Sequence, residues 1–205
     1  MARSTRLDHE ALASRLTEQH NVISRGQAMA VGMTSGALRH RIRSGGSWKE
    51  LLPGIYLAVT GTPTALQMEM ASLLYAGPWG LLTGPAALRR HGITSPLSGT
   101  FDVLVPANCQ RKSTGFVRLY RTTRLPERFY YQGPVRFVMP ARAVADTIRE
   151  LTALEDARAV LAGAVQRSKC TVGMLTEELA QGPQQGSRML RGALAEVMER
   201  NPFNS

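Results

Sequence analysis

The first 60 residues alternate short amphipathic segments with turn residues. Asp8 precedes a segment in which Leu12 and Leu16 recur one helical turn apart, and this spacing predicts a capped helix that ends near Asn21. The two apolar residues that follow are too few for more than a short strand. Ser24 then offers an N-cap to a second, shorter helix.

A third short helix and a hairpin complete this N-terminal part. The sequence GMTS predicts a tight turn, after which Thr34 or Ser35 caps a helix that is expected to end at Gly45 and Gly46. The apolar-rich runs SWKELL and GIYLAV then flank a Pro-Gly turn, which predicts a β-hairpin. Three short helices followed by a hairpin are typical of a winged helix-turn-helix domain, expected here over residues 1–60.

The polar face of the third helix is strongly basic. Leu38 and Ile42 lie four residues apart, so both must face the core if so small a unit is to fold. The opposite face then presents Gly36, Arg39, His40 and Arg43. Arginine on such a helix can read guanine edges in the DNA major groove, and a glycine permits close backbone approach. The alternative is a merely solvated helix face, which most charge runs form.

Other expected DNA contacts surround this helix. Ser24 and Arg25, at the start of the second helix, are expected to clamp a phosphate, and Lys49, near the hairpin, to contact the flanking backbone. The complete set of expected DNA-binding residues is Ser24, Arg25, Thr34, Ser35, Gly36, Arg39, His40, Arg43 and Lys49. Because a unit of about 60 residues binds one half-site weakly, full operator occupancy is expected to need two copies on repeated half-sites.

Residues 61–205 predict a second, mixed α/β domain. After a GTPT linker, the apolar segment ALQMEMASLLYAG predicts a helix that ends at Gly77. Strand candidates WGLLTG, GTFDVLVP, GFVRLYRT and PVRFVM follow, with a short helix after the first. That helix ends near His91, where the helix dipole favours positive charge. From Pro140 onward, four segments predict helices that end the chain, so the expected fold class is α+β.

The net charge of the chain narrows the classes of partner that it can bind. Its 205 residues carry 25 Lys and Arg against 15 Asp and Glu, a formal net charge of +10, which favours nucleic acid or an anionic membrane surface. The excess lies in the first two thirds of the chain. No apolar run approaches the roughly 20 residues of a membrane span, and the N-terminus lacks the apolar core of a signal peptide. We therefore expect a cytoplasmic protein that makes no membrane contact.

Little in the sequence indicates catalysis. Cys109 and Cys170 form no C-x-x-C pattern, and the four histidines belong to no metal-binding motif. Asp102 and Asp146 are a conceivable carboxylate pair, but no third partner stands at a diagnostic spacing. We expect no catalytic residues, cofactor or metal. The arginines of the basic strand region 111–136 fit either nucleic-acid contact or an ordinary sheet face.

The order of these segments resembles the AbiEi antitoxin family of type IV toxin-antitoxin and abortive-infection systems. Its most specific part is VISRGQAMAVGMTSGALRHRIRSGGSWKELLPGIYLAV, while LLTGPAALRRHGI, DVLVP, YRTTRLP and MPARAVADTIREL resemble blocks of the family's second domain. Thr83 and Gly84 stand where many members have a Ser-His pair. The resemblance implies a winged-helix DNA-binding domain, repression of the protein's own operon and neutralisation of a nucleotidyltransferase-type toxin.

We therefore expect a DNA-binding transcriptional regulator that is the autorepressing antitoxin of a type IV system. Its expected partners are double-stranded operator DNA and a cognate nucleotidyltransferase toxin. The alternatives are a nucleic-acid-processing enzyme with its site in the middle domain, an RNA-binding regulator, and a stand-alone transcriptional regulator without a toxin partner.

Overall fold

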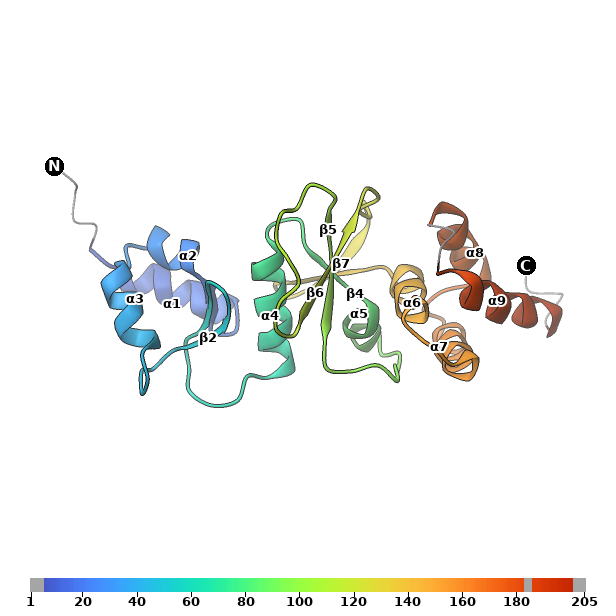
Figure 1. Ribbon diagram of the computed structural model, residues 1–205, viewed down its shortest axis with the longest axis horizontal. Helices are drawn as coiled ribbons and strands as arrows, with labels where there is room; N and C mark the ends of the chain where they lie inside the picture. The colour runs from blue at the N-terminus through green and yellow to red at the C-terminus, as the bar shows by residue number, and fades with distance from the viewer. Residues whose placement is uncertain (1–5, 183–185, 201–205) are drawn as a thin grey trace.

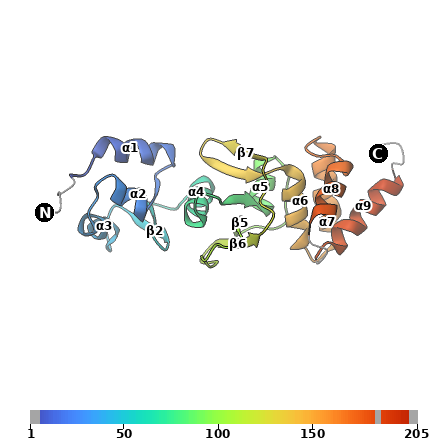
Figure 2. The ribbon, with the colours of Figure 1, turned by 90° about the horizontal axis from the view of Figure 1, so that it is seen from above.

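The structure, a computed structural model, describes residues 6–182 and 186–200. Its elements lie in successive layers along one long axis, with the first helices at one end and the last helices at the other (Figures 1 and 2). Helices and two β-sheets are both present, so the predicted α+β class is confirmed. Within the described ranges, helices that combine the length and the apolar character needed to cross a membrane are absent.

Capped helices and a small sheet form the N-terminal unit, residues 6–60. Asp8 caps the first helix by accepting a hydrogen bond from the Ala11 amide, and Ser24 and Gln27 form a capping box at the second. These N-caps are those that the sequence predicts. The elements of the unit are α1 (His9–Glu18), β1 (Val22–Ser24), α2 (Arg25–Ala30), α3 (Ser35–Ile42), β2 (Lys49–Leu52) and β3 (Ile55–Leu57).

Strand β3 lies at the centre of this small sheet, here called sheet A, and pairs antiparallel with both β1 and β2. Successive residues of a strand point to opposite faces. Ile23 and Tyr56 therefore pack in the core formed with α1, α2 and α3, together with Leu38. Their neighbours Val22 and Leu57 belong to the core of the second domain. Both faces of sheet A are thus buried.

Helix α4 (Ala65–Ala76) joins the two parts of the molecule. It packs against sheet A on one side and a larger sheet on the other (Figure 1). A helix covered from several sides needs apolar residues around most of its circumference, and ALQMEMASLLYA supplies them. Thr64 and Gln67 form its capping box, and Gly77 is its C-cap, as predicted. The Gln67 side-chain amide also donates to the His20 carbonyl oxygen at 3.1 Å, which ties α4 to the N-terminal unit.

The larger sheet, sheet B, is mixed and five-stranded, with strand order β6-β5-β4-β8-β7. The predicted strands are all present, and one further edge strand, β7, was not predicted. Its residues are mostly exposed and give no alternating apolar signal, so only pairing with β8 defines it. The strands of sheet B are β4 (Leu81–Thr83), β5 (Phe101–Pro106), β6 (Val117–Thr122), β7 (Phe129–Gln132) and β8 (Val135–Val138).

Helices cover the face of sheet B that lies opposite α4. Helix α5 (Gly84–Arg90) contacts the sheet and α6 (Pro140–Arg149) packs on α5 (Figures 1 and 2). Helices α7 (Leu154–Gln166), α8 (Val172–Gln181) and α9 (Arg188–Arg200) then pack against α6. The predicted helical C-terminal part is confirmed over the described residues. Of the two cysteines, Cys170 is buried and Cys109 is half-buried.

Candidate nucleic-acid interface

Helix α3 lies at the outer end of the molecule, away from the second domain (Figures 1 and 2). Leu38 is fully buried and Ile42 is half-buried, whereas Arg39 and His40 are exposed on the other face. Thr34 caps the helix, since its Oγ1 accepts a hydrogen bond from the Ala37 amide at 3.1 Å. The four-residue spacing of Leu38 and Ile42 therefore predicted correctly which face of this helix points toward the core.

The C-terminal end of α3 differs from the prediction. The helix ends at Ile42, and Arg43 is its C-cap in an extended conformation with ψ of 165°. The chain turns back here because the Trp48 amide donates to the Arg41 carbonyl oxygen at 2.9 Å. Gly46 lies in this tight return, where a Cβ would stand 2.1 Å from that same oxygen. Arg43 remains exposed but extends from the end of the helix and not from its face.

Helices α2 and α3 are joined near their N-termini by side chains from the expected set. Arg25 donates from its guanidinium to Ser35 Oγ at 3.0 Å, and its backbone amide donates to the Gly54 carbonyl oxygen at 2.8 Å. Gly36 is exposed, and the nearest atom to a Cβ built there is 3.9 Å away. The start of α3 is therefore open to solvent and flanked by one arginine.

The hairpin formed by β2 and β3 follows directly, as predicted. Lys49 is exposed at its start, and the neighbouring Glu50 carboxylate accepts a hydrogen bond from the Gly54 amide at 2.9 Å. The carboxylate of Glu50 thus stabilises the turn of its own hairpin. Arg41 places its guanidinium 5.5 Å from the centroid of the Trp48 ring, a cation-π contact that links α3 to the hairpin.

The chain from residue 24 to residue 49 carries five Lys and Arg and no Asp or Glu. Within the described part of the chain, the side chains of Arg39, Arg43 and Lys49 have neither a hydrogen-bonded nor an ion-paired partner. Ser24 lies apart from these cations, because its hydroxyl caps α2 and its side chain lines a cavity toward the second domain. The structure brings the rest of the expected set onto the α3 end of the N-terminal unit.

The arginines of region 111–136 are in a different situation, because protein groups already engage them. Arg118 bonds to Asp102 and Glu150, and Arg124 bonds to Glu178. The guanidiniums of Arg111, Arg121 and Arg136 donate to backbone carbonyl oxygens. Most of the positive charge in this region therefore holds the second domain together.

The two acids of the conceivable carboxylate pair, Asp102 and Asp146, each approach the same turn, between β4 and α5. Thr83 Oγ1 donates to Asp146 at 2.6 Å. A Cβ on the next residue, Gly84, would stand 2.8 Å from Asp102 Oδ2, and its φ of +57° also favours glycine. No third partner for these acids was evident in the sequence, because Thr83, Asp102 and Asp146 come from β4, β5 and α6, which are distant along the chain.

Arginines hold both carboxylates in place. Arg118 donates two hydrogen bonds to Asp102, at 2.8 and 2.9 Å, and Arg142 and Arg149 each donate to Asp146 at 2.8 Å. Burial raises the pKa of Asp102, and the bonds from Arg118 oppose that rise. Both acids are thus hydrogen-bond acceptors within the fold. In residues 6–182 and 186–200, His, Cys, Asp and Glu form no cluster of three or more suited to a metal ion.

His91 is the C-cap of α5, at the predicted helix end, but its burial opposes the positive charge that the helix dipole favours. The ring is buried against Tyr130 and Phe137, and its Nε2 is 2.8 Å from the Val138 carbonyl oxygen. Burial lowers the pKa of His91, so the neutral ring is favoured despite the helix dipole.

No protein-family model and no curated protein matches this chain. A similar arrangement is seen in the crystal structure of the RV2827C protein from Mycobacterium tuberculosis. The two share a TM-score of 0.56 at 13% sequence identity, over 93% of this chain and 78% of that chain. At this identity the likeness shows the shared fold alone.

Proposed function

We propose that this protein is a cytoplasmic, DNA-binding transcriptional regulator that reads duplex DNA with α3. The observation that carries the proposal is the exposed basic end of the N-terminal unit. Arg39, Arg43 and Lys49 face solvent there, and the described chain provides none of them with a carboxylate partner. Exposed cations without an acidic partner are suited to neutralise the phosphate groups of DNA.

The order of elements supports a winged helix-turn-helix mode of binding. Helix α2, a short turn and α3 are followed at once by the β2–β3 hairpin. In this mode α3 enters the major groove, where Arg39 contacts base edges and His40 and Arg43 lie beside it. Arg25 and the exposed hydroxyls of Thr34 and Ser35 meet phosphate at the α3 N-terminus, while Lys49 contacts the flanking backbone.

The antitoxin role is the second part of the proposal and rests on the resemblance to AbiEi proteins. In this role the second domain neutralises a nucleotidyltransferase-type toxin, and two copies of the N-terminal unit repress the shared operon from repeated half-sites. The resemblance runs through both parts of the chain, from the VISRG segment to the MPARAVADTIREL segment.

Fluorescence anisotropy tests the DNA-binding part. The probes are a labelled duplex taken from upstream of the protein's own coding sequence and a shuffled duplex of equal composition. The wild type is expected to prefer the first, and the double variant Arg39→Ala/Arg43→Ala to lose that preference. Arg167→Ala, an exposed arginine beyond α7, is the matched control and should bind like the wild type. Equal binding of both duplexes by the wild type would contradict sequence-specific regulation.

Labelled DNA and labelled RNA, assayed for turnover on denaturing gels and for binding by anisotropy, separate this proposal from the alternatives. A regulator leaves labelled DNA and RNA intact, whereas turnover would favour a nucleic-acid-processing enzyme. Preference for RNA over duplex DNA would favour an RNA-binding regulator. Co-expression with a neighbouring nucleotidyltransferase tests the antitoxin part: the full chain should restore growth, and failure to do so would leave a stand-alone regulator.

A further inference from the structure

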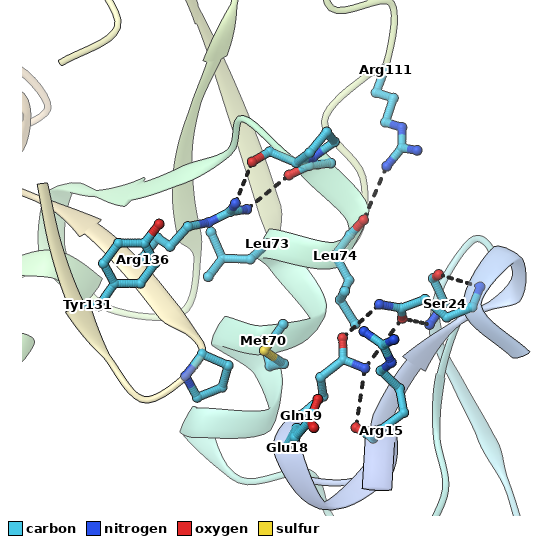
Figure 3. A pocket seen from close by; sticks show the side chains of 14 residues that line it. Arg15, Glu18, Gln19, Ser24, Met70, Leu73, Leu74, Arg111, Tyr131 and Arg136 are labelled. Carbon is cyan, nitrogen blue, oxygen red and sulfur yellow. Dashed lines mark hydrogen bonds between the residues drawn. The ribbon is translucent and has the colours of Figure 1, made fainter. Parts of the chain in front are cut away.

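A cavity of about 550 Å³ lies between the N-terminal unit and the second domain. Figure 3 shows side chains from both parts around it: Arg15 and Gln19 of α1 on one side, and Leu73 of α4 and Tyr131 of β7 on the other. Its volume is in the range of small-molecule sites, which span roughly 300 to 1,000 Å³. DNA binding by α3 does not use this cavity, because α3 lies at the far end of the N-terminal unit (Figure 2).

The charge of the cavity favours an anion. Its lining contains three arginines and one acid, Glu18. Arg111 donates to the Leu74 carbonyl oxygen at 3.3 Å, and Arg136 donates to carbonyl oxygens at the end of α4. Arg15 is exposed, and no described residue pairs with its guanidinium. One arginine is thus free to bind a ligand, while the other two are fixed and add positive potential.

The remaining walls favour a flat, partly apolar body. Met70, Leu73 and Leu74 form an apolar surface along α4. Tyr131 of edge strand β7 is 63% exposed, so a planar ligand can reach its ring although that ring also contacts Phe129 at a tilt. Gln19 is buried and accepts a hydrogen bond from the Gln27 amide at 2.8 Å, so this pair is a rigid polar wall.

From these groups we infer that the cavity binds a nucleoside monophosphate, with the phosphate at Arg15 and the base against Tyr131. Such a ligand combines the negative charge and the planar ring that the walls accept. Because its contacts come from α1 on one side and β7 on the other, it adds a link between the N-terminal unit and the second domain to the one that α4 makes. Ligand binding is therefore coupled to operator binding, and this regulatory step alone rests on the proposed function.

Isothermal titration calorimetry of the full chain with AMP, GMP, CMP and UMP tests the site directly. At least one is expected to bind more tightly than its nucleoside and than inorganic phosphate, which each supply half of the contacts. Arg15→Ala and Tyr131→Ala should each weaken binding about tenfold. Tyr131→Phe, which retains the ring, and Arg167→Ala, a distant exposed arginine, should bind as the wild type does. Absence of binding by all four nucleotides, or equal binding by Arg15→Ala, would overturn the inference.

Coupling is measured by repeating the titration with saturating operator duplex. The affinity for the nucleotide should change at least about fivefold, and by linkage the affinity for DNA should change by the same factor. An unchanged affinity would overturn the regulatory step while leaving the site. If the chain binds nucleotide but no DNA, the proposed function fails and the site stands.

Discussion

Val22 and Ile23 are adjacent in the chain and both fully buried, yet their side chains lie in two different hydrophobic cores. Ile23 packs with Leu38 beneath the basic helix, and Val22 packs with α4 and the second domain. Sheet A is therefore shared between the two parts of the molecule, and the surface that we propose for DNA depends on a helix beyond residue 60.

This sharing predicts how fragments behave. Residues 1–60 alone would expose Val22, Leu52, Ile55 and Leu57 to water. Exposure of each such side chain lowers the free energy of unfolding by about 1.5–3 kcal/mol. We expect this fragment to unfold at a lower temperature than residues 1–77, which retain α4. Circular dichroism melts at equal concentration check this. Identical cooperative melts would show that α4 does not support sheet A.

Single substitutions on α3 should separate base reading from phosphate contact. Arg39→Ala is expected to cost about 1–3 kcal/mol on the cognate duplex and less on the shuffled one, because a bidentate base contact is sequence-specific. Lys49→Ala should weaken binding to both duplexes by the same factor. Anisotropy titrations give the ratio of variant to wild-type affinity on each of the two duplexes. Equal losses for Arg39→Ala on the two duplexes would reduce α3 to a phosphate contact.

Salt should weaken DNA binding steeply, since the contacts release counterions. If six to ten phosphates are neutralised, affinity falls roughly 10³ to 10⁵-fold between about 50 and 200 mM salt. The slope of log affinity against log salt concentration should become shallower in Lys49→Ala and Arg43→Ala. It should stay unchanged in Arg128→Ala, which removes an exposed arginine of the second domain. A flat response in the wild type would remove the electrostatic basis of the proposal.

The half-buried carboxylate Asp146 should be a major determinant of stability. It accepts from Thr83, Arg142 and Arg149, and the two arginine side chains are only 7% and 15% exposed. Asp146→Ala removes the hydrogen-bond acceptor of both guanidiniums and leaves Arg142 only its 3.6 Å ion pair with Glu178, so we expect a loss of about 3–5 kcal/mol in the free energy of unfolding. Urea denaturation measures this. Glu127→Ala, which removes an exposed acid, is the control and should change stability little.

His91 predicts part of the pH dependence of stability. Burial lowers its pKa in the folded chain, whereas the unfolded chain protonates it near its ordinary value of 6.5. Below that pH the unfolded state binds more protons, so stability falls as the pH drops from 7 toward 5. His91→Gln should show a shallower decline than the wild type in urea melts at pH 5, 6 and 7. Parallel declines would assign the effect to other groups.

Local signals in the sequence determined much of the secondary structure. Ser24 and Thr64 cap helices because each can pair with a glutamine three residues later, an interaction that needs no distant partner. The Leu38 and Ile42 spacing fixed which face of α3 points outward, and with it the exposure of Arg39 and His40. The position of the expected DNA surface therefore follows from local periodicity.

Contacts between distant segments decided the rest, because they depend on strand pairing that no local pattern encodes. Strand β7 exists only through its pairing with β8, and it carries Tyr131 to the cavity near α1. The sequence leaves open whether the arginines of region 111–136 contact nucleic acid or belong to an ordinary sheet face. Folding decides this for two of them, because it brings Asp102 to Arg118 and Glu178 to Arg124. The tertiary structure thus determined which cations remain free to bind a partner, since only the folded chain brings each acid to its arginine.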